Sequence, residues 1–147
     1  MVIGIVLGLV LGTALDTLVP GAQTSPVGTS GVGQVTADNA LVDRWVDLQA
    51  SGSQADVEAM LRPNFRMASS NPAMAVQNPT GMWALILDGR RFNLVQARTT
   101  DVTRVGDVLF WGGSMEDPSP SAAIQDYTWT VRVDPEGRFV NAWLLFH

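Results

Sequence analysis

An alternating strand and the turn that follows it constrain the fold most strongly. Residues 124–133 alternate between apolar and polar side chains, so that Tyr127 and Trp129 share one face. A period of two is typical of a β-strand with one buried face. The sequence Asp134-Pro-Glu-Gly137 comes next, in which proline presets the first turn dihedral angle and glycine accepts a left-handed one. This pattern predicts an antiparallel hairpin whose second strand is residues 138–147.

Two further strands are predicted upstream of this hairpin, at residues 91–103 and 108–111. Their connection is short, which favours antiparallel pairing between neighbours. Gly112 and Gly113 follow, and glycines at such a point either let the sheet bend or end the strand. A cluster with two prolines at residues 116–121 cannot continue a ladder. The last third of the chain therefore predicts a meander of four strands.

Three helices are predicted before the meander, the first at residues 37–50 with Thr36 as its N-cap. Its apolar residues lie on one face, which is typical of a helix that covers a core. The second helix is predicted at residues 54–61. Ser53 precedes it as the cap, and Asp56 stands at the position that completes a capping box.

A short strand and a third helix complete the predicted elements. The strand is expected at residues 64–68, after the second helix. Asn78 is a suitable cap for the third helix, because Pro79 then occupies its first turn. The pair Asp88-Gly89 is expected to end this helix.

The first 20 residues predict a membrane anchor or a signal segment. They are almost entirely apolar, but their length is at the short limit for a spanning helix, and Asp16 interrupts them. No basic residue precedes the run, as a signal peptide would require. Gly4, Gly8 and Gly12 would form a smooth stripe on a helix, suited to close packing against another helix in a membrane. Anchor, cleaved signal and buried soluble helix are all open interpretations.

Residues 21–35 are rich in glycine, serine and threonine and predict a flexible linker before a domain at residues 36–147. This order predicts a domain that is membrane-anchored or exported. The side of the membrane stays open, because no basic residues flank the apolar segment and the positive-inside rule cannot be applied.

The composition excludes several kinds of chemistry. Without cysteine there is no disulfide, thiolate nucleophile or cysteine-bound metal, and the single histidine cannot build a multi-histidine metal site. The formal net charge of −5 and the lack of a basic patch argue against nucleic acid as a partner. No phosphate-binding glycine loop or nucleophile motif is present. We therefore expect no metal and no cofactor.

The order of elements resembles the NTF2-like superfamily in its SnoaL-like branch, over about residues 37–147. The segment Leu61-Arg-Pro-Asn-Phe65 resembles the point where the second helix of that fold turns into its first strand. The helix containing Gly81, followed by a long meander, resembles the remainder. The resemblance implies an α+β, cone-shaped barrel with three helices packed on a strongly curved, mainly antiparallel sheet, a pocket between them, and often a homodimer. Such domains include isomerases, cyclases, hydrolases and binding or assembly modules, so the fold does not select the function.

An aromatic pocket is the first candidate site. If Tyr127 and Trp129 face the cone, then Trp111, Trp143 and Met67 can join them in its wall. Aromatic walls with few polar groups suit a small apolar ligand. Packing of an ordinary core explains the same residues, because large apolar side chains are usually buried.

Catalytic candidates are few. The resemblance implies a pocket carboxylate as a base, whose pKa burial would raise towards neutrality. Asp101, near a strand end, is one candidate, although a solvated aspartate is the favoured interpretation at such a position. His147 is another, although chain ends seldom hold catalytic geometry. Tyr127 is the third, as the hydrogen-bond donor.

Two hypotheses follow. The leading one is a membrane-tethered or exported binding or assembly module, an accessory subunit of a membrane complex or a homodimer, with a pocket for a small apolar ligand. The alternative is a SnoaL-like or ketosteroid-isomerase-like enzyme that acts on a small apolar substrate. A carboxylate or imidazole inside the cone favours the enzyme, whereas a cone lined by aromatic residues, methionine and leucine favours binding.

Overall fold

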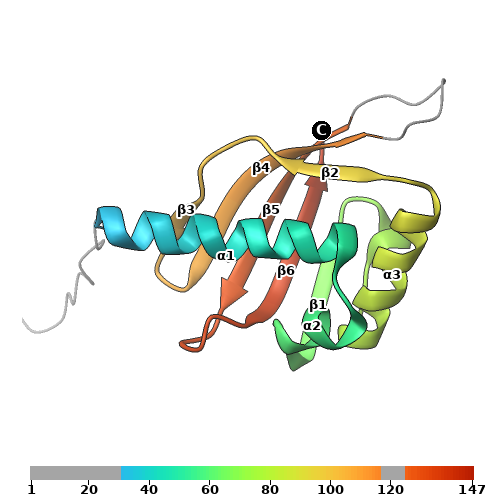
Figure 1. Ribbon diagram of the computed structural model, residues 1–147, viewed down its shortest axis with the longest axis horizontal. Helices are drawn as coiled ribbons and strands as arrows, with labels where there is room; N and C mark the ends of the chain where they lie inside the picture. The colour runs from blue at the N-terminus through green and yellow to red at the C-terminus, as the bar shows by residue number, and fades with distance from the viewer. Residues whose placement is uncertain (1–30, 117–124) are drawn as a thin grey trace, which may run out of the picture.

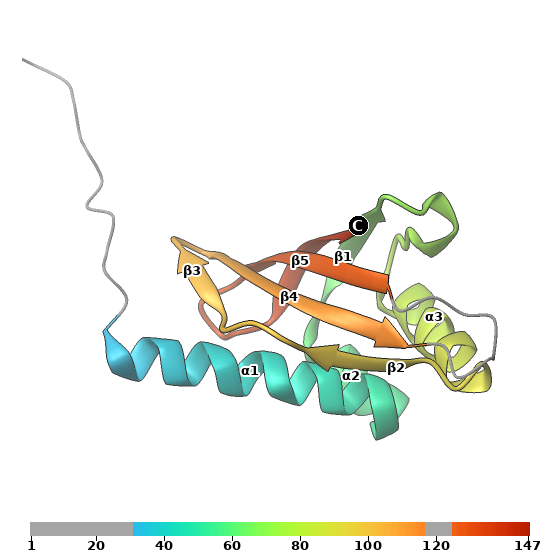
Figure 2. The same cartoon turned by 90° about the horizontal axis from the view of Figure 1, so that it is seen from above.

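The computed structural model describes residues 31–116 and 125–147, in which the helices lie on one side of a curved sheet (Figures 1 and 2). The apolar segment 1–20, with Gly4, Gly8 and Gly12, lies outside these residues, as does most of the predicted linker. Among the helices of the described ranges, none has the length and apolar character of a membrane span. The elements in chain order are α1 (Val32–Ser51), α2 (Gln54–Ala59), β1 (Leu61–Ser69), the 3-10 helix η1 (Pro72–Met74), α3 (Pro79–Arg91), β2 (Val95–Arg98), β3 (Thr103–Val105), β4 (Val108–Glu116), β5 (Gln125–Val133) and β6 (Phe139–Phe146).

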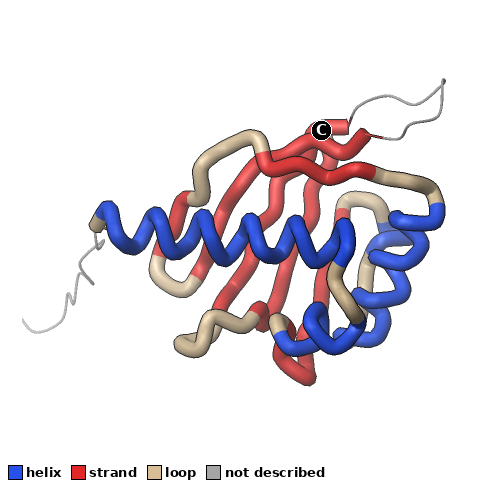
Figure 3. The backbone as a smooth tube through the Cα atoms, in the orientation of Figure 1, coloured by secondary structure: helices blue, strands red, loops and turns tan. Residues whose placement is uncertain are grey.

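The sheet has six strands in the order β1-β6-β5-β4-β2, and β3 also pairs with β4. Strand β1 runs parallel to β6, and every other pairing is antiparallel. Figure 3 shows α1 lying across the sheet and α3 at one end of it. The predicted α+β architecture, with three helices on a mainly antiparallel curved sheet, is therefore confirmed.

The sheet bends where β4 passes through its two glycines. The single strand predicted at residues 91–103 is instead two short strands, β2 and β3, which pair with opposite halves of β4. Between them, the amides of Thr99 and Thr100 both donate to the carbonyl of Gly112, at 3.0 and 3.3 Å. Two amides on one carbonyl mark a local irregularity that bends a strand. Strand β4 continues through Gly112 and Gly113 in regular register with β5, so the glycines do not end the strand, and the irregularity lies between β2 and β3.

Helix α1 begins at Val32, earlier than predicted, so that residues 32–35 are helical. Thr36 lies inside the helix, where its hydroxyl donates to the carbonyl of Val32 at 3.1 Å. A threonine side chain can cap the start of a helix or, inside a helix, donate to the carbonyl four residues earlier. The second role explains why the predicted start of α1 was too late. One turn further on, buried Asp38 accepts hydrogen bonds from Arg104 of β3 at 2.7 and 2.8 Å. This pair fixes the first half of α1 to the sheet.

The caps predicted for the other two helices are confirmed. The Ser53 hydroxyl accepts from the amide of Asp56 at 3.2 Å, and the Asp56 carboxylate accepts in return from the amide of Ser53 at 3.4 Å. The Asn78 side chain accepts from the amide of Gly81 at 2.7 Å. These bonds satisfy amides that a helix start leaves without partners. Strand β1 begins three residues before the predicted strand at 64–68.

Aromatic side chains form the centre of the core. Trp111 and Trp129 are cross-strand partners, and their rings stack with centroids 5.8 Å apart. Trp45 of α1 meets Trp129 edge-on at 6.2 Å and Phe139 at 5.3 Å. Such pairs contribute about 0.5–1.5 kcal/mol each beyond the burial of their area. They hold α1 on the sheet and place its last turn next to α3.

Candidate ligand-binding site

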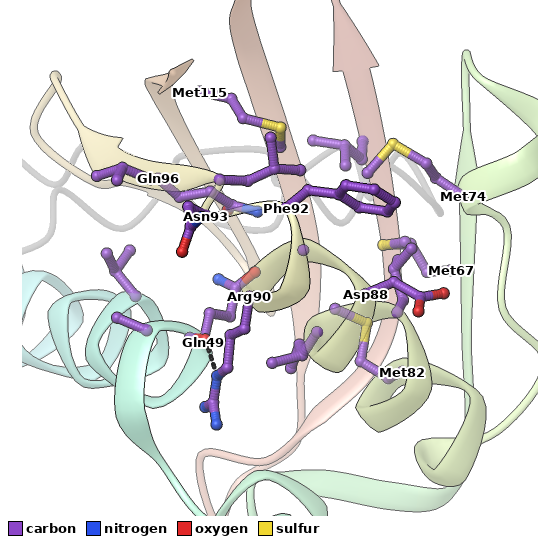
Figure 4. A pocket seen from close by; sticks show the side chains of 18 of the residues that line it. Gln49, Met67, Met74, Met82, Asp88, Arg90, Phe92, Asn93, Gln96 and Met115 are labelled. Atoms are coloured by element: carbon purple, nitrogen blue, oxygen red, sulfur yellow. Dashed lines mark hydrogen bonds between the residues drawn. The ribbon is translucent and has the colours of Figure 1, made fainter. Parts of the chain in front are cut away.

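A cavity of about 670 Å³ lies between the end of α1, helix α3 with the residues after it, and the face of the sheet that the helices cover (Figure 4). Its floor is formed by side chains of β1, β4, β5 and β6, among them Trp129 and Leu144. Val46 and Ala50 of α1 and Leu85 and Ile86 of α3 form the sides. Of the elements that line the cavity, the aromatic core fixes the positions of α1, β4, β5 and β6.

Methionine is the characteristic residue of the cavity. Met67 of β1, Met74 of η1, Met82 of α3 and Met115 of β4 all line it. They are four of the six methionines in the chain. Methionine is unbranched and polarizable, so that its side chain adapts to ligands of different shape. The wall is therefore apolar and deformable.

Phe92 stands at the mouth of the cavity, just after α3. Its side chain belongs to the lining, yet the residue is 63% exposed. In Figure 4 its ring extends over the cavity towards Met74. Asn93 follows with a positive φ of 54°, a conformation that asparagine adopts more readily than most residues. At this turn the chain passes from Phe92, at the mouth of the cavity, into β2.

Arg90 closes one wall, with its guanidinium directed to the end of α1. Its guanidinium donates to the carbonyls of Leu48, Gln49 and Gly52, at 2.6 to 2.9 Å. It also lies over the ring of Trp83, 5.1 Å from the centroid. The carbonyls at the end of a helix have no partners within it, and a cation there is stabilised by the helix dipole. Arg90 is therefore the cap that joins α1 to α3.

Two glutamines supply buried polar atoms. Gln49 is 8% exposed, and its Nε2 has no hydrogen-bond partner among the described residues. Gln96 of β2 is partly buried, and its Oε1 has no partner within the same residues. The other polar lining side chains, Asn71, Asp88 and Asn93, are exposed at the mouth. These two buried side chains are neutral.

The structure brings together only part of the predicted aromatic wall. Met67 and Trp129 line the cavity. Trp111 and Tyr127 are 2% exposed but lie outside the lining, in the core. The hydroxyl of Tyr127 donates to the carbonyl of Ala97 at 3.0 Å, and burial raises its pKa to about 12. This hydroxyl is therefore engaged within the fold.

Trp143 is on the opposite face of the sheet, where it is 44% exposed. Strands β5 and β6 pair so that Trp129 faces Leu144 and Thr130 faces Trp143. Because side chains alternate along a strand, Trp143 points away from the cavity together with Thr130. Trp143 therefore does not join the wall as predicted, because its strand turns Leu144 and not Trp143 to the buried face.

The two predicted acid–base residues also lie away from the cavity. The side chain of Asp101 is 88% exposed, with Arg98 3.8 Å away. His147 is exposed, and its Nε2 is 2.9 Å from the Thr128 hydroxyl on the outer face. Neither is among the residues that line the cavity. The predicted arrangement, with Asp101 or His147 beside Tyr127 inside the cone, is therefore not formed.

The sequence analysis missed most of the lining, including Gln49. One signal was present, because Val42, Trp45 and Gln49 follow the helical spacing of a buried stripe, and a glutamine on such a stripe is unusual. The methionines gave no comparable signal, since they come from four separate elements and converge only in the folded chain.

No family model matches this chain, and no curated protein matches it in sequence. Solved structures do match it in fold. A candidate isomerase of the SnoaL-like family from Agrobacterium tumefaciens C58 superposes with a TM-score of 0.63 at 14% identity, over 76% of this chain and 98% of that one. A candidate polyketide cyclase from Sinorhizobium meliloti gives 0.62 at 12% identity, over 76% and 98%. A de novo designed protein with a curved β-sheet gives 0.59 at 15% identity, over 76% and 86%. The chain therefore shares the α+β fold of these SnoaL-like structures, as the resemblance in its sequence implied.

Proposed function

We propose that this domain binds a small, mostly apolar and uncharged molecule in the methionine-lined cavity. The observation that carries the proposal is the convergence of four methionines from four elements on one cavity of about 670 Å³. Ligand sites in proteins typically have volumes of about 300–1,000 Å³ and mainly apolar walls. Protein interiors otherwise leave few voids larger than a water molecule. A ligand would bury the apolar surface that this cavity leaves unfilled.

The charges around the cavity favour a neutral ligand. Of the described residues that line it, the charged ones are Asp88 and Arg90. Asp88 is exposed at the mouth, and Arg90 is engaged with the end of α1. An anionic group inside would lose its hydration and meet a guanidinium whose Nε and Nη2 already donate to the end of α1. A cationic group would lose its hydration and find a carboxylate only at the exposed mouth.

Methyl signals of the methionines provide a direct test. The full-length protein with ¹³C-labelled methionine methyl groups is titrated with biphenyl, and its NMR spectrum is followed. We expect shifts at Met67, Met74, Met82 and Met115, which line the cavity. Met60 is buried but lies outside the lining, so its signal serves as the internal control. Unchanged signals, or equal shifts at all five, would contradict the proposal.

A pair of tryptophan substitutions on α3 makes the test specific for the cavity. Leu85 lines the cavity, whereas Leu87 is 45% exposed and outside the lining. Leu85→Trp is expected to fill the space and abolish the shifts caused by biphenyl. Leu87→Trp adds the same group on another face of the helix and is expected to leave them intact. Equal effects of the two variants would show that biphenyl binds elsewhere.

A second candidate function is catalysis on a molecule of the same kind. It is favoured by the likeness in fold to a candidate isomerase and a candidate polyketide cyclase, and by the carboxylate of Asp88 among the lining residues. Liquid chromatography coupled to mass spectrometry separates isomers as well as products of different mass, so it measures conversion of small apolar ketones incubated with the protein. Conversion by the wild type that Asp88→Asn removes would support catalysis, and unconverted ketones would leave binding as the function.

The apolar segment at residues 1–20 supports a further proposal, that the domain is held at a membrane or exported. Fractionation of cells that express the full chain, compared with a variant lacking residues 1–20, tests it. We expect the full chain in the membrane or exported fraction and the shortened chain in the soluble fraction. The same distribution for both would argue against a role for this segment in localisation.

A further inference from the structure

Phe92 holds a large apolar ring in water at the mouth of the cavity. The residue is 63% exposed, although its side chain belongs to the lining. Figure 4 shows the ring extending over the cavity towards Met74 of η1, which also lines it. Exposure of an apolar ring to water is unfavourable in proportion to its area. The ring would lose part of this exposed area by lying against an apolar ligand in the cavity below it.

The main chain at Phe92 is fixed by the way in which α3 ends. The amide of Asn93 donates to the carbonyl of Arg90 at 3.0 Å, and the amide of Leu94 donates to the carbonyl of Gly89 at 2.9 Å. These two bonds, with the positive φ of 54° at Asn93, form the Schellman motif that ends many helices. Because this motif holds the main chain, Phe92 moves by rotation of its side chain and not by movement of a loop.

Rotation of the Phe92 ring changes access to the cavity. A side chain has three staggered positions about its first torsion angle, about 120° apart. Exposed side chains exchange between such positions within picoseconds to nanoseconds. In the position that Figure 4 shows, the ring lies over the cavity, so a rotation of this size carries it away from there. Met74 is partly buried and unbranched, so it adapts its shape to the ring that lies towards it.

We propose that Phe92 is the lid of the cavity: its ring turns aside to admit the ligand and then lies over it. This inference rests on the proposed binding function. Three polar residues that line the cavity, Asn71, Asp88 and Asn93, are also exposed at the mouth. Their side chains cannot give an apolar ligand the apolar cover that the Phe92 ring gives.

A lid and a fixed wall have different effects on binding rates. A fixed ring that only contacts the ligand slows its departure and leaves its entry unchanged. A ring that covers the mouth for part of the time slows both, because the ligand enters only while the ring is turned away. If one of the three staggered positions leaves the mouth open, entry is slowed about threefold. The association rate constant therefore distinguishes the lid from the wall.

Substitutions at Phe92 test the lid with biphenyl as the probe. Line shapes of the Met67 and Met82 methyl signals during the titration give the association and dissociation rate constants. Phe92→Ala is expected to raise the association rate constant about threefold. It should raise the dissociation rate constant about tenfold, because the ligand loses an apolar contact as well as its cover. Phe92→Trp, which places a larger ring over the same mouth, is expected to lower the association rate constant.

Leu87→Ala is the matched control. Leu87 is 45% exposed on the same helix and outside the lining, so its loss should leave both rate constants unchanged. An association rate constant that does not rise in Phe92→Ala would overturn the lid, even if dissociation is faster, because the ring would then be a fixed part of the wall. Equal changes in Leu87→Ala would also overturn it.

The outcomes separate the lid from the function on which it rests. If biphenyl shifts the cavity methyl signals and its association rate constant is the same with and without the ring, the binding function stands and the lid is wrong. If biphenyl shifts none of these signals in the wild type or in Phe92→Ala, both fail. Because position 92 is exposed, its substitution is expected to leave the fold intact.

Discussion

Tyr127 lies directly over Gly113, its partner on the neighbouring strand β4. A Cβ atom at position 113 would collide with the phenol ring and with the carbonyl oxygen of Ala97. That carbonyl accepts the hydrogen bond from the Tyr127 hydroxyl, at 3.0 Å. The missing side chain at position 113 thus lets the ring cross from β5 over β4 to β2. The contact ties three strands together next to the bend of the sheet.

The substitution Gly113→Ala is therefore expected to destabilise the protein. Inserting a methyl group where backbone and ring leave no space costs about 1–3 kcal/mol. Chemical denaturation followed by tryptophan fluorescence measures the change. Gly112→Ala is the control, because its Cβ would lie 3.2 Å from the Thr100 Cγ2 atom, a contact that a small shift relieves. Equal losses in the two variants would show that the covering of Gly113 by Tyr127 is not the cause.

The ionisation of Tyr127 can be followed by itself, because it is the single tyrosine of the chain. Burial raises its pKa to about 12, so absorbance at about 295 nm should titrate near that pH in the folded protein and near the ordinary value of 10.0 in denaturant. Since the folded state holds the proton more tightly, stability is complete below about pH 10 and is lost as the pH rises towards 12.

The variant Tyr127→Phe controls that experiment. It removes the absorbance change and also the part of the alkaline loss of stability that comes from this group. It costs about 1 kcal/mol near neutral pH, because the carbonyl of Ala97 loses its donor. A folded-state midpoint near pH 10 in the wild type would mean that the phenol is accessible to solvent.

The helix caps, the hairpin turn and the buried face of β5 are the parts of the fold that could be predicted from the sequence. The capping box of Ser53 and Asp56 and the cap at Asn78 each depend on residues within a few positions. The hairpin turn does so too, with Gly137 at a φ of 80°. Alternation correctly placed Trp129 on the buried face of its strand. Interactions of this range are encoded in a short window and need no knowledge of tertiary contacts.

The site could not be predicted because it depends on register and convergence. Trp143 faces outwards because β6 pairs with β5 in one register, and a shift by one residue exchanges the two faces. Met74 and Met115 are 41 residues apart in the numbering and line the same cavity only through the packing of η1 beside the sheet. The long strand expected across Asp101 is instead two short strands, and Asp101 lies exposed between them.

The ion pair between Asp38 and Arg104 predicts a loss of stability in acid. Burial acts to raise the pKa of Asp38, but hydrogen bonds from Arg104 and Gln34 and the charge of Arg104 outweigh it, so that the pKa lies below 3.8. A lowered pKa in the folded state stabilises the protein above the unfolded value, and this contribution is lost as the pH falls through the folded value. The wild type should therefore weaken below about pH 4.

The variant Asp38→Asn tests this contribution. It is expected to lower the free energy of unfolding by about 2–3 kcal/mol near neutral pH, because a charge-assisted pair at a buried position is lost. The difference from the wild type should shrink as the pH falls, since Asp38 itself becomes neutral. Asp43→Asn is the control: the Asp43 side chain is 53% exposed in its pair with Arg98, and such exposed pairs contribute about 0–1 kcal/mol. A difference that stays constant with pH would exclude ionisation of Asp38 as the cause.

The last prediction concerns Arg90, which joins the two helices that enclose the cavity. Arg90→Met keeps an apolar stem over Trp83 but removes the donors to the three carbonyls at the end of α1. Hydrogen bonds from a charged group contribute about 1.5–3 kcal/mol, so we expect a loss of that size in urea denaturation. Arg90→Lys should recover only part of it, because a single ammonium cannot reproduce the fork of a guanidinium.

The neighbouring arginine provides the matched control for this loss. Arg91 is exposed at the end of the same helix, so Arg91→Met removes the same charge at almost the same place without freeing the carbonyls of α1. It should change the free energy of unfolding by less than about 0.5 kcal/mol, as is usual for surface substitutions. Arg90→Met should also weaken binding of biphenyl, because the turn that carries Gln49 loses its anchor beside the cavity. Equal effects of the two variants would mean that charge at the end of α3, and not the bonded cap, stabilises the wall.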